Sequence, residues 1–197
     1  VFHVGQLQEF AERDEESGSA GTETRIALPA TVNGRIIPGD VDRAQFPPRQ
    51  VPQYMPGDID RYRFAARKGQ DLVVAAAARE LTPYLADAVP GWFQATITLY
   101  DANGHEVAYD DDYRFQPDPV LHYRIPADGD YVVEIKDALF RGREDFVYRI
   151  AIGELPFVTG MFPLGGRTGQ KTIVQVGGWN LALRNVAMAA QQAEPGI

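Results

Sequence analysis

Short segments in which apolar and polar residues alternate run through most of the chain. Tyr131, Val133 and Ile135 fall on one face of such a segment, and the charged Glu134 and Lys136 fall on the other. A period of two places successive side chains on opposite sides of an extended backbone, so the pattern predicts a half-buried β-strand. We expect further strands at residues 25–33, 61–64, 71–79, 95–101, 105–109, 120–125, 146–152 and 171–177.

Two dipeptides mark turns between these segments. Asn103-Gly104 follows the segment 95–101, and Asp128-Gly129 precedes the strand that begins at Asp130. Both dipeptides suit the positive φ angles of tight hairpin turns, so we expect a hairpin at each. About eight short strands at such spacing predict an all-β fold, an antiparallel and jelly-roll-like β-sandwich.

Little of the sequence favours helix. A short helix is expected near residues 80–89, before Pro90-Gly91. Residues 181–193 end in an alanine-rich stretch with helical propensity, but they equally suit a strand.

A six-residue unit occurs twice, as Pro38-Gly39-Asp40-Val41-Asp42-Arg43 and as Pro56-Gly57-Asp58-Ile59-Asp60-Arg61. Only the second copy runs into an alternating segment. The first leads to Pro47-Pro48, and proline cannot donate a hydrogen bond to a central β-ladder. We therefore expect residues 43–55 to be an exposed insertion and the second copy to be the structural one.

The composition excludes several chemistries. The 197 residues include no cysteine, which rules out thiol nucleophiles, disulfides and cysteine-ligated zinc. Ser17 and Ser19 are the only serines, and both lie in a polar stretch without rigid support for a nucleophile. There is no basic stripe for nucleic acid, and no apolar run approaches the roughly 20 residues of a membrane-spanning helix.

The acidity is concentrated near the N-terminus. The net charge is -8, and residues 1–24 hold six acidic side chains against Arg13 alone. This stretch therefore carries more than half of the net negative charge.

Several segments, taken in order, resemble the bacterial pre-peptidase C-terminal domain, a β-sandwich attached to secreted peptidases and large cell-surface proteins. The resemblance covers about residues 26–153. It implies that the chain is a piece of a multidomain, exported protein. The segments that carry it are Val32-Asn33-Gly34, Pro56 to Phe64, Gly69-Gln70-Asp71-Leu72, Thr98 to Gly104, Asp111-Asp112, Ile125 to Tyr131 and Tyr148-Arg149-Ile150.

Three regions follow from this comparison. Residues 1–24 resemble the acidic lead-in of the family, although Glu12-Arg13-Asp14-Glu15-Glu16 stands where the family commonly has Glu-x-Glu-Pro-Asn. Residues 25–156 form the expected sandwich, with a boundary near Pro156. Residues 157–197 are similar to the opening strands of an immunoglobulin-like, TIG-type module, which we expect to be a partial second β module.

In some members of the family, the lead-in and the Gly-Asp-x-Asp turn bind calcium together. The resemblance therefore nominates Glu12, Asp14 and Glu16 from the lead-in, with Asp58 and Asp60 from the turn, as metal ligands. Calcium takes six to eight oxygen ligands, and carboxylates from two segments can supply them. Clustered carboxylates repel one another without a cation, so binding would also order the lead-in. The alternative is a solvated acidic linker beside an aspartate-capped turn.

A second, weaker calcium candidate is the cluster of Asp110, Asp111 and Asp112 with Asp118. Consecutive residues of a strand cannot all face one ion. A solvated acidic surface is the alternative.

Aromatic residues flank Pro90-Gly91. Tyr84, Trp92 and Phe93 would form a platform for a sugar ring or a protein strand if they were exposed. The alternative is that Trp92 and Phe93 close one end of the core.

We expect a non-catalytic accessory domain of an exported bacterial protein, extracellular or at the cell surface. A peptidase is one candidate for the parent protein. The domain would space, stabilise or target that protein, with calcium as its cofactor. Its expected partners are the other domains of the parent, with polysaccharide or extracellular protein as further candidates, and with no nucleic acid and no membrane insertion. Two alternatives stay open: a carbohydrate- or matrix-protein-binding module that uses residues 84–93, and a hydrolase with two acidic residues.

Overall fold

The structure is a computed structural model, and it describes residues 5–12, 23–38, 56–82 and 91–189. The chain divides into two compact units, Val1–Gly153 and Glu154–Ile197. This division falls close to Pro156. The expected insertion at 43–55 lies outside the described residues.

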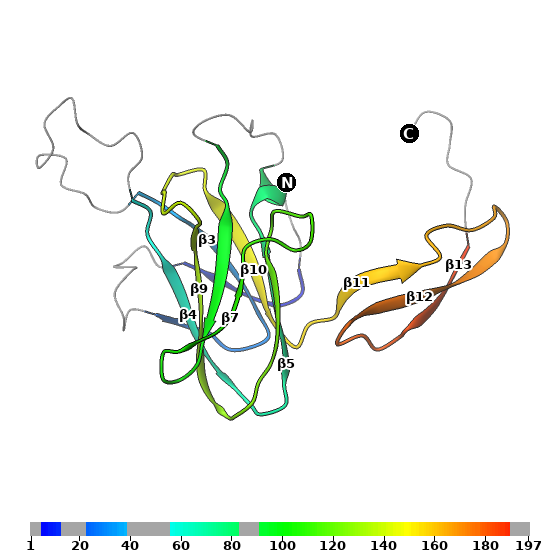
Figure 1. Ribbon diagram of the computed structural model, residues 1–197, viewed down its shortest axis with the longest axis horizontal. Coiled ribbons are helices and arrows are strands. Elements are labelled where there is room, and N and C mark those ends of the chain that lie inside the picture. Colours follow the sequence, from blue (N-terminus) through cyan, green and yellow to red (C-terminus); the bar gives the residue numbers. More distant parts are fainter. Residues whose placement is uncertain (1–4, 13–22, 39–55, 83–90, 190–197) are drawn as a thin grey trace, which may run out of the picture. The chain divides into compact units, whose positions relative to one another are not determined.

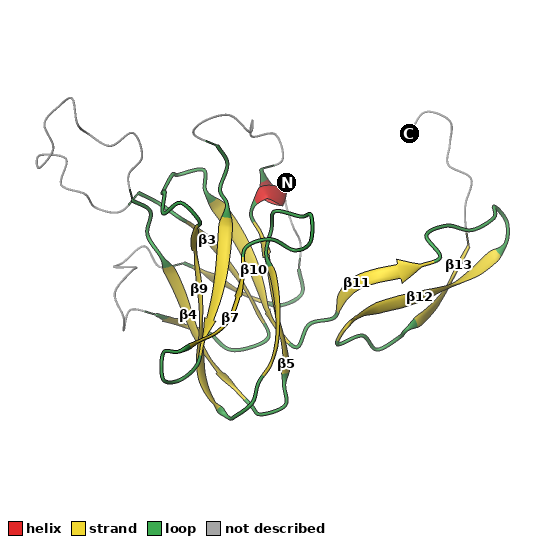
Figure 2. Ribbon diagram, in the orientation of Figure 1, coloured by secondary structure: helices red, strands yellow, loops and turns green. Residues whose placement is uncertain are grey.

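The first unit is a β-sandwich of two five-stranded sheets (Figure 1). The first sheet has the order β1 (Gln8–Ala11), β3 (Ala30–Arg35), β10 (Val147–Gly153), β5 (Asp71–Ala77) and β8 (Val120–Arg124). The second sheet has the order β2 (Thr24–Arg25), β4 (Asp60–Ala66), β9 (Gly129–Asp137), β6 (Ala95–Tyr100) and β7 (Glu106–Asp110). Strands dominate the described chain (Figure 2), so the predicted all-β sandwich is confirmed.

Apolar side chains from both sheets form one core. Tyr131, Val133 and Ile135 are all buried, on the face that the alternation predicted. The largest fully buried side chains are Ile36, Tyr62, Phe64, Leu72, Ile97, Leu99, Ile125, Ile135, Phe146, Tyr148, Ile150 and Ile152. Burial of each Leu, Ile or Phe side chain in this set contributes about 1.5–3 kcal/mol relative to an exposed position, which holds the two sheets together.

The strand expected at 25–33 is divided between the two sheets. Residues 24–25 pair in parallel with β4, whereas residues 30–35 pair with β1 and β10 in the other sheet. Pro29 lies just before β3 and has no N–H to donate to a continuous ladder. The chain therefore changes sheets here instead of continuing as one strand.

The two predicted hairpins have opposite outcomes. Asn103-Gly104 does join the antiparallel strands β6 and β7, and Gly104 has a φ of 79°. The hairpin predicted at Asp128-Gly129 is wrong, because β8 and β9 belong to different sheets. Asp128 instead accepts a 2.6 Å hydrogen bond from the Lys68 N–H, in a connection that crosses from one sheet to the other.

Part of the acidic lead-in is a strand of the sandwich. β1 pairs in parallel with β3, and the Glu9 carboxylate holds it there. Arg149 donates two hydrogen bonds to Glu9, at 2.6 and 2.8 Å, and the Asn33 amide donates a third at 2.6 Å. This contact sets the position of Glu12 at the end of β1.

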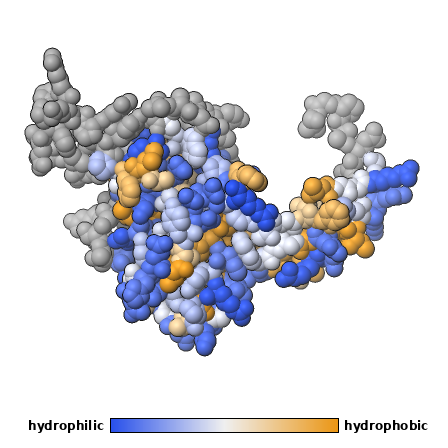
Figure 3. Space-filling model, viewed as in Figure 1, coloured by the Kyte–Doolittle hydropathy of each residue, from blue (hydrophilic) through white to orange (hydrophobic). Residues whose placement is uncertain are grey.

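The second unit is a three-stranded antiparallel sheet. Its order is β11 (Phe157–Phe162), β12 (Lys171–Trp179) and β13 (Asn185–Ala189), and the rings of Phe157 and Trp179 stack at 5.4 Å. The strand alternative is thus correct for 185–189, while 190–193 lie outside the described residues. Many apolar side chains of this unit are exposed (Figure 3), including Val158, Met161, Phe162, Leu164, Ile173, Leu183 and Met188.

Regular helix is nearly absent from the described residues. A single 3-10 turn, η2 (Arg79–Leu81), lies where the short helix near 80–89 was expected, and residues 83–89 lie outside the described part. No helix in the described ranges is long and apolar enough to cross a membrane.

Candidate metal centre

Three acidic side chains converge where β1 ends and β4 begins. One ligand oxygen from each of Glu12, Asp58 and Asp60 lies within 4.8 Å of the other two. This is the only group of three or more aspartate, glutamate or histidine side chains at such spacing within the described residues. We call Glu12, Asp58 and Asp60 the acidic triad. Asp14 and Glu16, the other two nominated ligands, lie outside the described residues.

Backbone hydrogen bonds position Glu12 and Asp58. The Glu12 N–H donates to the Asn33 carbonyl at 2.9 Å, and the Glu12 Oε2 accepts from the Arg35 N–H at 2.6 Å. The Asp58 N–H donates to the Ile37 carbonyl at 3.1 Å. The second half of β3 and the segment that follows it therefore bring the lead-in and the Gly-Asp-Ile-Asp turn together.

Asp60 is the buried member of the triad, with 2% of its surface exposed. Its Oδ2 accepts a 2.6 Å hydrogen bond from the Tyr148 hydroxyl, which lies 2.5 Å from the Tyr62 hydroxyl. Its Oδ1 is buried and receives no hydrogen bond from any described residue. Burial, reinforced by the charge of Glu12, raises the pKa of Asp60 to about 9.

The alternation of β10 already placed Tyr148 on the buried face with Ile150, and a buried tyrosine hydroxyl usually has a polar partner. That signal was available in the sequence, but the role of Tyr148 and Tyr62 at the triad was missed. Their partner could not be identified because Asp60 lies in the other sheet.

Gly34 makes room for this arrangement. It pairs with Tyr148 across β3 and β10. A Cβ at this position would overlap the Tyr148 hydroxyl and would lie 2.7 Å from the Glu12 Oε2. Steric crowding by Tyr148 and Glu12 therefore explains why glycine occurs at position 34.

The donor set fits a hard cation. All three candidate ligands are carboxylates, which calcium prefers, and the buried Oδ1 of Asp60 lies in the triad without a hydrogen-bond donor from the described chain. Three side chains can supply only part of the six to eight oxygens that calcium takes.

No protein-family model matches the sequence, and no curated protein matches it either. The structure is similar to the pre-peptidase C-terminal domain of a collagenase from Bacillus anthracis, at 13% identity and a TM-score of 0.43, over 69% of this chain and 99% of that one. This is the family that the sequence segments resemble.

Two further similar structures are inhibitors. They are PliG, a periplasmic inhibitor of g-type lysozyme, from Aeromonas hydrophila and from Salmonella Typhimurium. The first is 14% identical, with a TM-score of 0.38, over 66% of this chain and 95% of the inhibitor. The second is 20% identical, with a TM-score of 0.37, over 67% of this chain and 98% of the inhibitor. At these values the likenesses assign no activity, ligand or partner to this chain.

The second acidic cluster is not gathered around one point. Asp110 accepts a 2.8 Å hydrogen bond from the Val120 N–H. Asp118 accepts from the N–H groups of Arg79 and Glu80, at 2.7 and 2.9 Å. Two of the four candidate ligands therefore bind backbone donors, and Asp111 and Asp112 are exposed beside them.

The aromatic residues 84–93 do not form the expected platform as a set. Phe93 is 3% exposed and stacks on Phe146 at 5.2 Å, so it belongs to the core. It precedes Ala95 and Ile97 in the same alternation, which explains why it faces inward. Trp92 is half-buried beneath the Arg79 guanidinium, 5.3 Å from the ring centroid, and Tyr84 lies outside the described residues.

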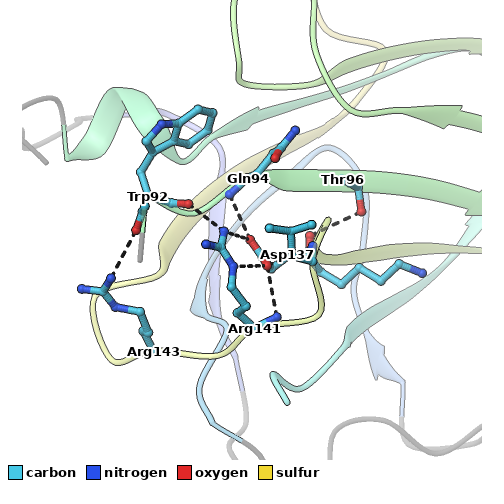
Figure 4. Close-up of polar contacts among 9 residues, drawn as sticks. Trp92, Gln94, Thr96, Asp137, Arg141 and Arg143 are labelled. Carbon is cyan, nitrogen blue, oxygen red and sulfur yellow. Dashed lines mark hydrogen bonds and ion pairs between the residues drawn. The ribbon is translucent and has the colours of Figure 1, made fainter. Parts of the chain in front are cut away.

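A buried ion pair holds the loop that contacts the turn of the triad. The sequence did not indicate this pair. Asp137 has no exposed surface and accepts from the Arg141 Nε and Nη2 at 2.8 and 2.9 Å. Arg141 Nη2 also donates to the Trp92 carbonyl at 3.0 Å (Figure 4).

The same carboxylate accepts hydrogen bonds from three backbone N–H groups, those of Gln94, Leu139 and Arg141. The loop that it holds includes Phe140, whose carbonyl accepts a 2.9 Å hydrogen bond from the Gly57 N–H. Asp137 thereby braces the turn that carries Asp58.

Proposed function

We propose that this chain is a non-catalytic accessory module of an exported multidomain protein, and that calcium bound by the acidic triad fastens its N-terminal strand to the sandwich. The module would act outside the cell or at its surface, where it would space, stabilise or target its parent protein. The resemblance of residues 26–153 to a pre-peptidase C-terminal domain supports the exported setting.

The observation that carries the proposal is the convergence of the triad. Glu12 comes from the lead-in, while Asp58 and Asp60 come from a turn far along the chain, yet their ligand oxygens lie within 4.8 Å of one another. Burial and the neighbouring charge of Glu12 raise the pKa of Asp60 to about 9, so without a cation this site favours a proton on Asp60. A divalent cation would replace that proton and attract all three carboxylates.

Each member of the triad would have a distinct task. Tyr148 donates to the Oδ2 of Asp60, so Oδ1 would be the oxygen that Asp60 offers to the cation. Glu12 would tie the end of β1 to the site, since its Oε2 already accepts from Arg35 on β3. The positive charge of calcium would hold the lead-in and the Gly-Asp-Ile-Asp turn together. Calcium would also need oxygen ligands other than the three carboxylates of the triad.

The burial of Asp60 argues against this residue as one of the two acids of a hydrolase. A catalytic carboxylate must reach its substrate, and Asp60 is 2% exposed. The alternative based on residues 84–93 is weakened because Phe93 packs in the core.

Thermal unfolding in calcium and in chelator tests the proposal. A ligand present at a hundredfold excess over its Kd stabilises the folded state by about 2.7 kcal/mol, so calcium should raise the Tm by several degrees. Asp58→Asn should remove most of this rise, whereas Asp111→Asn, an exposed aspartate outside the triad, should keep it. Equal melting in calcium and chelator, or an unchanged response in Asp58→Asn, would refute the site.

A further inference from the structure

A cavity of about 240 Å³ lies on the outer face of the second sheet, and the triad does not contribute to it. Its lining includes Glu23, Arg61, Arg63, Tyr100, Asp101 and Val132. Its volume is below the roughly 300–1,000 Å³ of drug-sized sites, so it has room for a single ring rather than a long chain.

The strand register creates this hollow. Arg63 on β4 pairs with Val132 on β9, which pairs with Tyr100 on β6. The short valine thus lies between two long side chains on the outer face, and it forms the floor. The β6–β7 hairpin closes one end through Asp101.

Carboxylates hold the polar side chains of the cavity in place. Arg63 pairs with Glu23 at 3.1 Å, and the Glu23 side chain is largely buried. The Arg61 Nε and Nη2 both donate to one oxygen of Glu134, at 2.8 and 2.7 Å. Because Glu134 is 2% exposed, it fixes the Arg61 guanidinium before any ligand arrives.

The charges of the lining indicate a neutral ligand. Two guanidinium groups and two carboxylates, those of Glu23 and Asp101, line the cavity. A phosphate would meet the carboxylates and a metal ion would meet the guanidinium groups, so neither charged ligand is favoured. A ring with several hydroxyls can both donate to the carboxylates and accept from the arginines, while its apolar face packs on an aromatic side chain.

We propose that this cavity binds one neutral sugar ring, which packs against Tyr100 and exchanges hydrogen bonds with Arg61, Arg63 and Asp101. This binding function is separate from the calcium site, and it uses none of residues 84–93.

Saturation-transfer NMR tests this proposal on the full chain, with the methyl glycosides of glucose, galactose, mannose and N-acetylglucosamine as probes. We expect transfer to the ring protons of at least one glycoside. Tyr100→Ala should weaken its binding by tenfold or more. Tyr109→Ala provides a matched control, because Tyr109 is an exposed tyrosine on the neighbouring strand and does not line the cavity.

Ala102→Phe provides a second variant that tests the cavity if Tyr100→Ala fails to fold. Ala102 lines the cavity from the exposed hairpin, so a larger side chain there should block the site without removing a core contact. The proposal is overturned if no glycoside receives transfer, or if a folded Tyr100→Ala or Ala102→Phe binds as the wild type does. Tighter binding of inorganic phosphate than of every glycoside would also overturn it.

Discussion

The Tyr148 hydroxyl on β10 donates a 2.6 Å hydrogen bond to the Oδ2 of Asp60 at the start of β4. This contact joins the two sheets of the sandwich at the acidic triad. Both residues are buried, so each polar group depends on the other for a partner that water cannot supply.

Tyr148→Phe should weaken calcium binding by about 10–100-fold, because Asp60 would lose the group that orients it. Isothermal titration with calcium measures the affinity. Terbium luminescence adds a signal that depends on a tyrosine near the ion. Tyr62→Phe is the matched control, since it removes a neighbouring buried hydroxyl but leaves the Tyr148–Asp60 contact in place. Equal affinities in the two variants would contradict a positioning role for Tyr148.

The stability of the calcium-free protein should fall as the pH rises above about 4. Burial and the charge of Glu12 raise the pKa of Asp60 to about 9 in the folded state, so the folded state holds this proton more tightly than the unfolded chain does. The stabilisation is complete below the ordinary aspartate pKa and is lost as the pH approaches 9. Urea unfolding in chelator at about pH 5 and about pH 8 measures the change.

Asp60→Asn supplies the reference for this measurement, because asparagine stays neutral at every pH. Relative to Asp60→Asn, the wild type should have a lower free energy of unfolding at about pH 8 than at about pH 5. Added calcium should reverse this loss in the wild type only. A pH-independent difference would show that Asp60 does not titrate in this window.

Gly34→Ala should destabilise the sandwich by about 1–3 kcal/mol, the usual cost of excess volume in a packed interior. The added methyl would overlap the Tyr148 hydroxyl and crowd the Glu12 carboxylate, so the calcium response should shrink as well. Gly129→Ala is the control, since a Cβ there meets only the Ala102 Cβ at 3.7 Å. Urea unfolding of both variants with and without calcium provides the comparison, and similar stabilities would argue against the close packing at Gly34.

Asp137→Asn should cost about 3–5 kcal/mol, because it leaves the Arg141 guanidinium buried without its counter-charge. The calcium response should also weaken, since the loop held by Asp137 binds the Gly57 N–H beside Asp58. Asp112→Asn, at an exposed position, should change stability by no more than about 0.5 kcal/mol. Chemical denaturation measures both values. An Asp137→Asn variant as stable as Asp112→Asn would show that the ion pair does not brace this loop.

Local pattern predicted the strands well, because the apolar residues of a strand that face the core recur at every second position. Val133 and Ile135 are buried where that alternation placed them. The sheet to which a strand belongs leaves no such local signal. For this reason the Asp128-Gly129 connection was misread as a hairpin, although the segments on either side were correctly expected to be strands.

The candidate site was predictable only in part. The resemblance nominated Glu12, Asp58 and Asp60, and the fold brings these three together. It gave no indication of Asp137, whose partners Gln94 and Arg141 flank two different strands. The aromatic residues around Pro90-Gly91 led us to expect Phe93 as a ligand contact, but its position in the alternation with Ala95 and Ile97 places its ring in the core.

By itself, the sequence determined the class of fold, the chemistries that lack the necessary side chains, and the acidic character of the lead-in. Alternation, turn residues and composition are local properties, so they can be read without knowing which segments meet. Only the tertiary structure decided that Glu12 lies beside Asp58 and Asp60, that Tyr148 reaches Asp60 from the opposite sheet, and that Arg63 and Tyr100 flank Val132. Such contacts depend on strand order and register, which arise from the packing of the whole core.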